Sequence, residues 1–475
     1  MLTKIKKSLF FALLLASFYS FGQKDGYNIK IKLDNYNFDT LYLGNYYGSS
    51  QYIKDTAIIN SKKMFVFSGK EALLGGVYLV ITQDKKYFEV IIDKEQNFTI
   101  ECQYDDFYKN IKIKGSPDNE IYCQFVNYNR VKYELYSPFQ KKMEAMKDNK
   151  DTVAWCKKQL EVISNEIGDY KKKFMSENPN HLMTKVFKAS KEVDVPDPPK
   201  KADGSIDSLY SYRYYKQHYW NNVDFTDDRI LRTPVYHNKL DYYFKNLIIP
   251  SNDSIKVACD EIIEKARPSK ELFKYTVWYL TNRYEKSSIM GQDEIFVHLV
   301  EKYYMSNQAF WVTPTILETI SKRAMQLKPI LIGKVAPELI MPDTSGAFVS
   351  MRSSRGRFTF LVFWDTDCGH CKVEMPKIKK FYDENKAKYG LEVFSIDTDS
   401  DLERWKKYII ENKHEWISVT GTKTNLDYHK VYDIISTPVL LILDKDFKII
   451  AKHISIDDAK GFLDNYLERE KLQKK

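Results

Sequence analysis

The strongest constraint on the fold is a regular alternation of strand and helix patterns in the last third of the chain. Apolar runs rich in Val, Ile, Leu and Phe alternate with longer segments whose apolar residues recur at helical spacing. Strands are expected at residues 358–364, 391–397, 439–443 and 448–452, and helices at about 368–389, from Asp401 and from Asp457. Because strands that alternate with helices form βαβ units, this part predicts an α/β sheet.

The earlier parts of the chain follow different patterns. Between residues 27 and 114, short runs rich in Ile, Val, Tyr and Phe are separated by turn residues, which predicts an antiparallel β-sandwich or open barrel. After the Gly-Ser-Pro turn at 115–117, apolar residues recur at helical spacing. A chain of 475 residues is expected to hold about three domains. We therefore expect a β-sandwich domain of unknown function at 23–115, an α-helical domain at 116–327 and the α/β domain at 328–475.

Residues 1–22 are typical of a secretory signal peptide. Three lysines precede an apolar run at 9–18, and Ser20-Phe21-Gly22 fits a cleavage site. The run is shorter than the ~20 residues that a membrane-spanning helix needs. We therefore expect this segment to be removed, leaving no transmembrane anchor, and the mature chain to work outside the cytoplasm, where disulfides persist.

Composition indicates a folded protein that does not bind nucleic acid. Aromatic residues make up 15% of the chain, whereas disordered chains lack such large apolar groups. The formal net charge of +9 is spread along the sequence and forms no compact basic stripe, which argues against a nucleic-acid surface.

Cys368 and Cys371 lie where the first strand of the α/β domain leads into a helix, in the stretch FWDTDCGHCKVEMP. A helix N-terminus presents unpaired N–H groups and the positive end of the macrodipole, so it lowers the pKa of a cysteine placed there from ~8.5. We therefore expect Cys368 to be the exposed nucleophile and Cys371, one turn further along, to be the resolving thiol.

Two other uses of this Cys-x-x-Cys pair fit less well. A zinc site needs a second pair of ligands at suitable spacing, and none of the other cysteines supplies one. A purely structural disulfide across so short a loop would constrain the unfolded chain little. The pair therefore predicts a redox-active disulfide that uses no metal and no cofactor.

From about residue 333 onward the chain resembles the thioredoxin-fold proteins of the TlpA and ResA type. The residues that carry this resemblance are GKVAPEL at 333–339, Trp364 and Thr366 of a W-x-T-x-C pattern, Pro376, and Thr437-Pro438 before a strand. The resemblance implies a cis peptide bond at Pro438, pairing of the Thr437 backbone with an extended substrate peptide, and a substrate-binding role for Trp364. It also implies a bacterial cell envelope, so that the mature protein is expected in the periplasm.

Glu374 lies on the same helical face as Cys371, in a C-x-x-C-x-x-E pattern. In the resembling family a glutamate at this position takes part in the proton transfers of the two sulfurs. A carboxylate beside a thiol can act as a general base if burial raises its pKa. Val362 stands where thioredoxins proper have a buried aspartate, which supports a catalytic role for Glu374.

His370 and Asp367 are expected to tune the redox couple in opposite directions. An imidazole between the cysteines stabilises the thiolate and makes the disulfide more oxidising. Gly369-His370 is the dipeptide of disulfide isomerases, whereas the reductive TlpA and ResA proteins usually carry proline in place of this histidine. Asp367 and Asp365 place negative charge near Cys368, which raises the pKa of its thiol. The sequence therefore leaves the direction of electron transfer open.

Together these features predict an enzyme, a periplasmic thiol–disulfide oxidoreductase that exchanges disulfides with protein substrates and with an electron donor or acceptor in the envelope. A reductase of the TlpA and ResA type is favoured. A disulfide isomerase or oxidase, and an interaction protein with a regulatory thioredoxin-like domain, are the alternatives. A thiol peroxidase is not expected, because Asp365 and Leu361 occupy the hydroxyl and proline positions of the peroxiredoxin pattern.

The remaining cysteines, Cys102, Cys123, Cys156 and Cys259, are single and widely spaced. They allow three sets of disulfide pairings, or can remain as buried thiols, and the sequence does not choose between these states.

Overall fold

The computed structural model describes residues 26–200, 203–398, 401–422, 424 and 426–473. The signal peptide expected at 1–22 lies outside these residues. The chain divides into two compact units, Met1–Asp241 and Tyr242–Lys475. The division falls inside the expected helical domain, and the domain boundaries at 115/116 and 327/328 stay predictions.

The first unit begins with two β-sheets that share one apolar core. The strands are β1 (Tyr27–Asp34), β2 (Thr40–Tyr47), β3 (Ser50–Ile58), β4 (Phe65–Gly69), β5 (Gly76–Thr82), β6 (Tyr87–Ile92), β7 (Asn97–Gln103) and β8 (Lys112–Lys114). They are arranged in the orders β4-β1-β7-β8 and β3-β2-β5-β6. The expected sandwich is present, with one difference: β1 and β7 run parallel.

Alternating side chains explain why these strands form a sandwich. In β1, Ile29 and Ile31 are fully buried while Lys30 is exposed. The same alternation places Leu41 and Leu43 of β2 in the shared core. Since successive side chains of a strand point to opposite faces, each sheet has one apolar face to bury.

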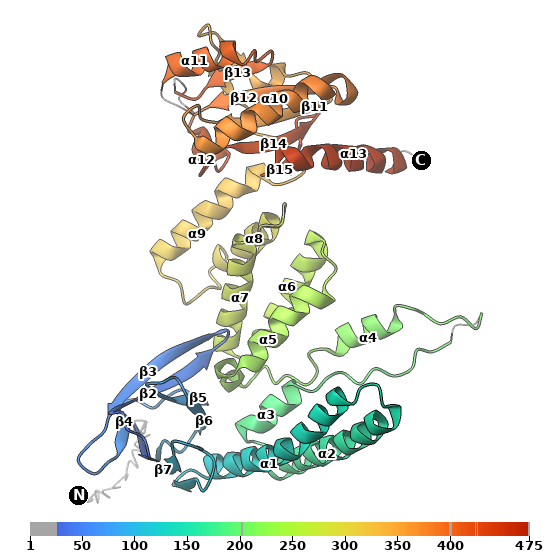
Figure 1. Ribbon diagram of the computed structural model, residues 1–475. Coiled ribbons are helices and arrows are strands. Elements are labelled where there is room, and N and C mark those ends of the chain that lie inside the picture. Colours follow the sequence, from blue (N-terminus) through green and yellow to red (C-terminus); the bar gives the residue numbers. More distant parts are fainter. Residues whose placement is uncertain (1–25, 201–202, 399–400, 423, 425, 474–475) are drawn as a thin grey trace, which may run out of the picture. The chain divides into compact units, whose positions relative to one another are not determined.

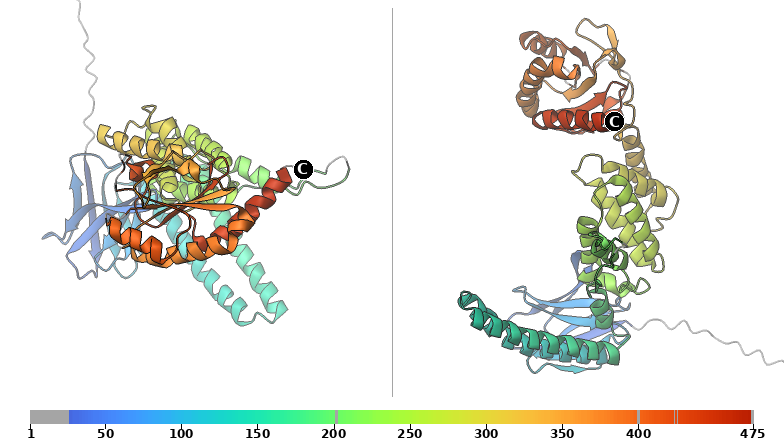
Figure 2. Two further views of the ribbon diagram at one scale, coloured as in Figure 1. Left: turned by 90° about the horizontal axis from the view of Figure 1, so that it is seen from above. Right: turned by 90° about the vertical axis from the view of Figure 1, so that its right-hand side faces the viewer.

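Helices follow the sheets in the first unit. They are α1 (Pro117–Ala145), α2 (Lys150–Glu177), α3 (Leu182–Ala189), α4 (Tyr210–His218), the 3-10 helix η1 (Asp228–Arg232) and α5 (Pro234–Tyr242), which ends at the boundary between the units. α1 and α2 form an antiparallel hairpin that extends beyond the sheets, as the views in Figures 1 and 2 agree. Asn149 caps α2 by accepting a hydrogen bond from the Thr152 amide at 3.0 Å.

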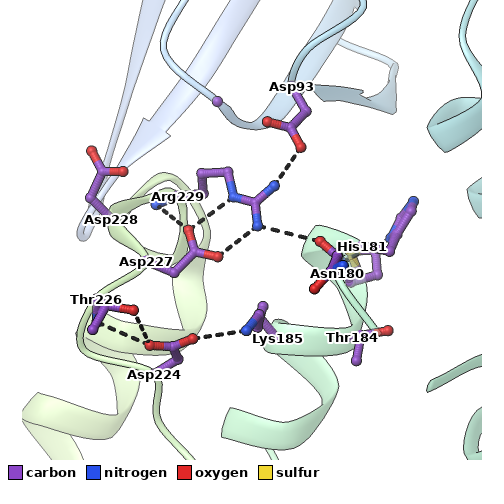
Figure 3. A network of polar contacts seen from close by, with 12 residues as sticks. Asp93, Asn180, His181, Thr184, Lys185, Asp224, Thr226, Asp227, Asp228 and Arg229 are labelled. Atoms are coloured by element: carbon purple, nitrogen blue, oxygen red, sulfur yellow. Dashed lines mark hydrogen bonds and ion pairs between the residues drawn. The ribbon is translucent and has the colours of Figure 1, made fainter. Parts of the chain in front are cut away.

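A polar network joins the helical segment of the first unit to its β-sheets (Figure 3). Arg229 of η1 forms ion pairs with Asp93, which follows β6, and with Asp227, and it donates a hydrogen bond to the carbonyl of Asn180. All three charged side chains are largely buried, with 18% of Arg229 exposed. Burial alone would raise the pKa of Asp227, but the Arg229 guanidinium outweighs burial and holds that pKa below its ordinary value.

Substituting Arg229→Met should destabilise the first unit by about 2 kcal/mol, because it leaves two partly buried carboxylates without their cation. Urea unfolding, followed by tyrosine and tryptophan fluorescence, measures the loss. Lys172→Met is the matched control, since Lys172 pairs with Asp169 on the surface, where 76% of the lysine side chain is exposed, and it should leave the midpoint unchanged. Equal shifts in both variants would contradict this account of the network.

The second unit begins with the helices that precede the α/β domain. They are the π-helical turn η2 (Tyr243–Leu247), α6 (Asn252–Ala266), α7 (Lys270–Glu285), α8 (Asp293–Leu299), the π-helical turn η3 (Val300–Tyr304), α9 (Pro314–Leu327) and the 3-10 turn η4 (Lys328–Ile330). The helical middle part expected from the sequence is confirmed. Among the described residues, no helix has the length and apolar character needed to cross a bilayer.

The α/β domain completes the second unit. It consists of the hairpin β9 (Ile340–Pro342) and β10 (Phe348–Ser350), the 3-10 turn η5 (Met351–Ser353), β11 (Phe358–Trp364), α10 (Gly369–Tyr389), β12 (Leu391–Asp397), α11 (Leu402–Glu411), β13 (Ile417–Thr420), α12 (Tyr428–Val431), β14 (Val439–Asp444), β15 (Ile449–Lys452) and α13 (Ile456–Gln473). Its main sheet has the order β13-β12-β11-β14-β15, in which β11 pairs parallel to β12 and antiparallel to β14. The expected thioredoxin-like fold is confirmed.

β11 lies at the centre of this sheet and is buried along its whole length. Phe358, Phe360 and Val362 belong to the core that also includes side chains of α10 and α13. The alternate side chain Phe363 faces the other way and contacts the rings of Tyr428 and Tyr432. A strand covered on both faces reads as one continuous apolar run, which is why its bounds could be predicted from the sequence.

Candidate active site

The end of β11 and the start of α10 place Cys368 at the N-cap of the helix. Its backbone is extended, with φ −69° and ψ 122°, and its Sγ accepts a hydrogen bond from the Cys371 amide at 3.4 Å. A sulfur therefore occupies the position where Ser, Thr or Asp usually caps a helix. The unpaired N–H groups of the first turn face this sulfur, and they stabilise negative charge on it.

The loop before β14 faces the same sulfur. The Cys368 thiol donates a hydrogen bond to the carbonyl oxygen of Thr437 at 3.4 Å. The bond between Thr437 and Pro438 is cis, as expected. The structure thus brings together Cys368, Thr437 and Pro438, which lie about 70 positions apart in the sequence.

The two thiols differ strongly in environment. Cys371 is only 1% exposed, and its Sγ accepts a hydrogen bond from the Asp365 amide at 3.4 Å. Burial raises the pKa of Cys371 to about 12. Burial also acts to raise the pKa of Cys368, but the hydrogen bonds to its sulfur, led by that from the Cys371 amide, outweigh burial and lower this pKa. Cys368 is therefore the thiol that ionises first and the one that solvent reaches.

Glu374 lines a small cavity of about 290 Å³ near the start of α10. The residues that line this cavity are Val362, Glu374, Ile378, Pro438, Leu440, His453, Ile454, Ser455 and Ile456. The Glu374 carboxylate is 27% exposed and pairs with the ammonium of Lys377 at 2.8 Å. Pro438 lines the same cavity, and the residue before it, Thr437, accepts the hydrogen bond from the Cys368 thiol.

The two expected tuning residues lie on the surface around Cys368. His370 is exposed in the first turn of α10. Asp367 is 67% exposed, and its carboxylate lies 3.2 Å from the Lys372 ammonium and 3.9 Å from the Arg404 guanidinium. These cations offset the negative charge that Asp367 brings near the nucleophile.

Trp364 is 1% exposed, so its ring cannot contact a docked protein. The ring packs against Tyr408, with ring centroids 4.9 Å apart, and also contacts His414. The substrate-binding role expected for Trp364 therefore does not fit its position, because the strand that ends at Trp364 is covered on both faces. Its side chain supports the end of β11 from the core.

Sequence reasoning missed the cations Lys372, Lys377 and Arg404. Lys377 was within reach of a helical-spacing argument, because it lies three positions after Glu374 on α10. Lys372 pairs with Asp367, which precedes the helix, so helical spacing does not predict that contact. Arg404 comes from α11, where it also donates a hydrogen bond to the Thr366 hydroxyl at 3.2 Å. Only the fold brings it to the active-site loop.

The four cysteines outside the active site are buried thiols in the structure. Burial raises the pKa of both Cys102 and Cys123 to about 12. Because the thiolate is the reactive form, such thiols are chemically inert at neutral pH.

The site therefore holds one reactive and one buried thiol facing a cis proline, at the end of the central strand of a thioredoxin-like sheet. In this arrangement Cys368 can attack a substrate disulfide to form a mixed disulfide. Cys371 can then attack the Cys368 sulfur and release the substrate thiolate. The second unit thus carries the fold and the dithiol of the thioredoxin-fold thiol–disulfide oxidoreductases.

Comparisons with known proteins agree with this class. Family models match residues 356–449 as thioredoxin-like, 170–327 as a domain of unknown function (DUF5106) and 27–122 as another (DUF4369). The thiol-disulfide oxidoreductase ResA of Bacillus anthracis is 30% identical over 144 residues, which cover 29% of this chain and 78% of that protein. ResA of Bacillus thuringiensis subsp. konkukian is 29% identical over 138 residues, with the same shares covered.

Among solved structures, a domain of a possible thiol-disulfide isomerase from Cytophaga hutchinsonii is 38% identical, covering 31% of this chain and 99% of that chain, with a TM-score of 0.29. Through its C-terminal domain, the chain belongs to the ResA family of thiol–disulfide oxidoreductases.

The different environments of the two thiols predict a separation in their reactivity with pH. In the reduced protein, alkylation of Cys368 by iodoacetamide should rise with pH and level off below the ordinary pKa of a cysteine, because its thiolate is stabilised. Alkylation of Cys371 should remain slow until the pH approaches 12. Mass spectrometry of peptides, with each cysteine also studied alone in the Cys371→Ser and Cys368→Ser variants, measures both profiles. Coinciding profiles would contradict the assignment of nucleophile and resolving thiol.

Proposed function

We propose that this protein works in the periplasm as a reductase of disulfide bonds in protein substrates. The observation that carries the proposal is the asymmetry between Cys368, a partly exposed helix-capping thiol, and Cys371, a buried one. The named relatives are thiol–disulfide oxidoreductases, which supports the chemistry. The periplasmic location is supported by the pattern of residues 1–22.

The proposed reaction moves two electrons from the dithiol to the substrate. The Cys368 thiolate attacks one sulfur of a substrate disulfide, so that a mixed disulfide forms and the other substrate sulfur leaves as a thiolate. Cys371 then loses its proton and attacks the Cys368 sulfur, which releases the second substrate thiolate. The enzyme is left with the Cys368–Cys371 disulfide and the substrate with two thiols, and a dithiol donor in the envelope must reduce the enzyme again.

Glu374 supports the second step. Cys371 holds its proton tightly, since burial raises the pKa of its thiol to about 12. A base must therefore remove this proton before Cys371 can attack. Glu374 lies one helical turn beyond Cys371, in the cavity that Pro438 also lines, and we assign it this role. The backbone of Thr437, on the other side, is placed to pair with the extended substrate segment that carries the disulfide.

Disulfide isomerisation is the second candidate, and the exposed His370 favours it. An imidazolium between the cysteines stabilises the Cys368 thiolate and makes the couple more oxidising. An interaction protein with a regulatory thioredoxin-like domain is the third candidate, and it predicts that the protein functions without its nucleophile.

The reduction potential of the Cys368–Cys371 couple, measured by equilibration with glutathione, separates the candidates. We expect a value near that of thioredoxin, about −270 mV, and rapid reduction of insulin that Cys368→Ser abolishes. A value near about −180 mV, with refolding of a scrambled disulfide protein, would instead support an isomerase. Failure of the unmodified protein in both assays would contradict the enzymatic proposal. Cys371→Ser should accumulate the mixed disulfide and so identify the substrate.

Substituting Glu374→Gln should slow insulin reduction about tenfold, because the resolving thiol loses its general base. The alkylation rate of Cys368 at neutral pH should change little, since that thiol is stabilised by backbone groups. Glu384→Gln on the exposed face of the same helix is the matched control, because Glu384 pairs only distantly with Lys380, at 3.9 Å. An equal loss in both variants, or a loss of Cys368 alkylation, would contradict the assigned role.

A further inference from the structure

Arg323 of α9 forms an ion pair with Asp433 of the α/β domain. The Asp433 side chain is only 13% exposed, and that of Arg323 30%. Asp433 has a φ of +56°, in the left-handed region, and it directly precedes the segment 434–438 that ends at the cis proline. The chain therefore turns at a residue whose side chain is held from outside the thioredoxin-like fold.

A second ion pair joins the same two parts of the chain. Asp293, the first residue of α8, pairs with the ammonium of Lys452, the last residue of β15. The Lys452 side chain is only 6% exposed, and its ammonium also donates a hydrogen bond to the carbonyl of Ile330 at 3.2 Å. Its backbone amide donates to the Met290 sulfur at 3.3 Å. The loop 453–456 begins at the next residue.

Both tethered loops lead to the redox site, where the proposed function places the substrate. Pro438 from the first loop and residues 453–456 from the second line the cavity that also holds Glu374. The first loop also presents Ile435, whose side chain is 82% exposed, and the Thr437 carbonyl that accepts the hydrogen bond from Cys368. Residues of the helical middle part therefore hold each loop at the residue that precedes it, Asp433 or Lys452.

The nature of the two contacts explains how helices can fix the loops. A charge as buried as that of Lys452 requires its counter-ion, since leaving it unpaired in a low dielectric is strongly unfavourable. A left-handed residue such as Asp433 is held only where its surroundings determine it. A loop without such anchors opens locally at a low cost in free energy. If that loop must align with a substrate backbone, its opening lowers the affinity of the protein for the substrate, because binding must first order the loop.

We propose that α8 and α9 position the substrate-binding loops of the redox domain, with Arg323 and Asp293 as positioning residues for thiol–disulfide exchange. This role extends the proposed function and rests on it. It assigns an activity to part of the region 170–327, which matches a domain of unknown function. The helices act mainly on substrate binding, because the sulfur of Cys368 is stabilised first by the Cys371 amide of its own helix and only secondarily by Thr437 of the loop.

A double-mutant cycle on the first ion pair tests the proposal in the full-length protein. Arg323→Gln and Asp433→Asn should each raise the KM for oxidised insulin about fivefold, with kcat changed less than about twofold, because only the binding surface is disturbed. Asparagine accepts a left-handed backbone as readily as aspartate does, so Asp433→Asn removes the charge alone. The double variant should be no worse than either single one, and Arg323→Lys should restore most of the affinity.

Two controls separate positioning from general damage. Arg357→Gln breaks the ion pair with Glu470, at 2.6 Å, beyond the opposite end of β11, and should leave the KM unchanged. The alkylation rate of Cys368 should change less than about twofold in all variants, because the Cys371 amide still holds the sulfur. Unchanged KM values in Arg323→Gln and Asp433→Asn, with the unmodified protein active on insulin, would overturn the inference. So would a parallel loss of Cys368 alkylation.

Hydrogen exchange tests the loops independently of activity. The amides at 434–437 should exchange about fivefold faster in Arg323→Gln, and those at 453–456 in Asp293→Asn, while the centre of β11 stays protected. Unchanged exchange in both loops would overturn the inference even if the protein failed to reduce insulin. That failure alone, with the faster exchange observed, would count against the proposed function and support the positioning of the loops.

Discussion

The hydrogen bond from the Cys371 amide to the Cys368 sulfur is the interaction on which the rest of the site depends. It exists because β11 ends at Trp364 and α10 begins at Gly369, so that Cys368 has to cap the helix. The burial of β11 on both faces fixes the end of that strand, and with it the sulfur. The loop before β14 then places the Thr437 carbonyl where it accepts a hydrogen bond from this thiol. The rigid packing of the sheet therefore fixes the position of the nucleophilic sulfur.

Much of this arrangement follows from local sequence, and the rest depends on long-range contacts. The bounds of β11 and β12 were predicted because both strands are long apolar runs between clear turns. The roles of Cys368 and Cys371 followed from a strand leading into a helix. β13 was missed because it is short and its pattern, ISVT, is weak. Trp364 was placed correctly at the strand end, but its substrate-binding role does not fit its burial, which the local sequence does not reveal.

Ion pairs that cross the fold could not be predicted from the sequence. Arg323 and Asp433 are separated by 110 positions, and Asp293 and Lys452 by 159. Nothing in the local pattern distinguishes these side chains from the many solvated charges around them. Their importance comes from burial, and burial depends on where α8 and α9 meet the edge of the sheet. A region without catalytic residues of its own can therefore influence the redox site through the loops that it holds.

Hydrogen bonds and burial act on the direction of electron transfer together with the charges of Asp367 and His370. From the sequence, Asp367 and His370 oppose each other through charge. In the structure Asp367 is offset by Lys372 and Arg404, and the pKa of Cys368 is lowered chiefly by hydrogen bonds from the helix. Stabilising this thiolate makes the couple more oxidising, whereas the burial of Cys371 disfavours its thiolate and opposes that effect. The potential therefore depends on the helix cap at Cys368 and on the burial of Cys371 as well as on the dipeptide between the cysteines.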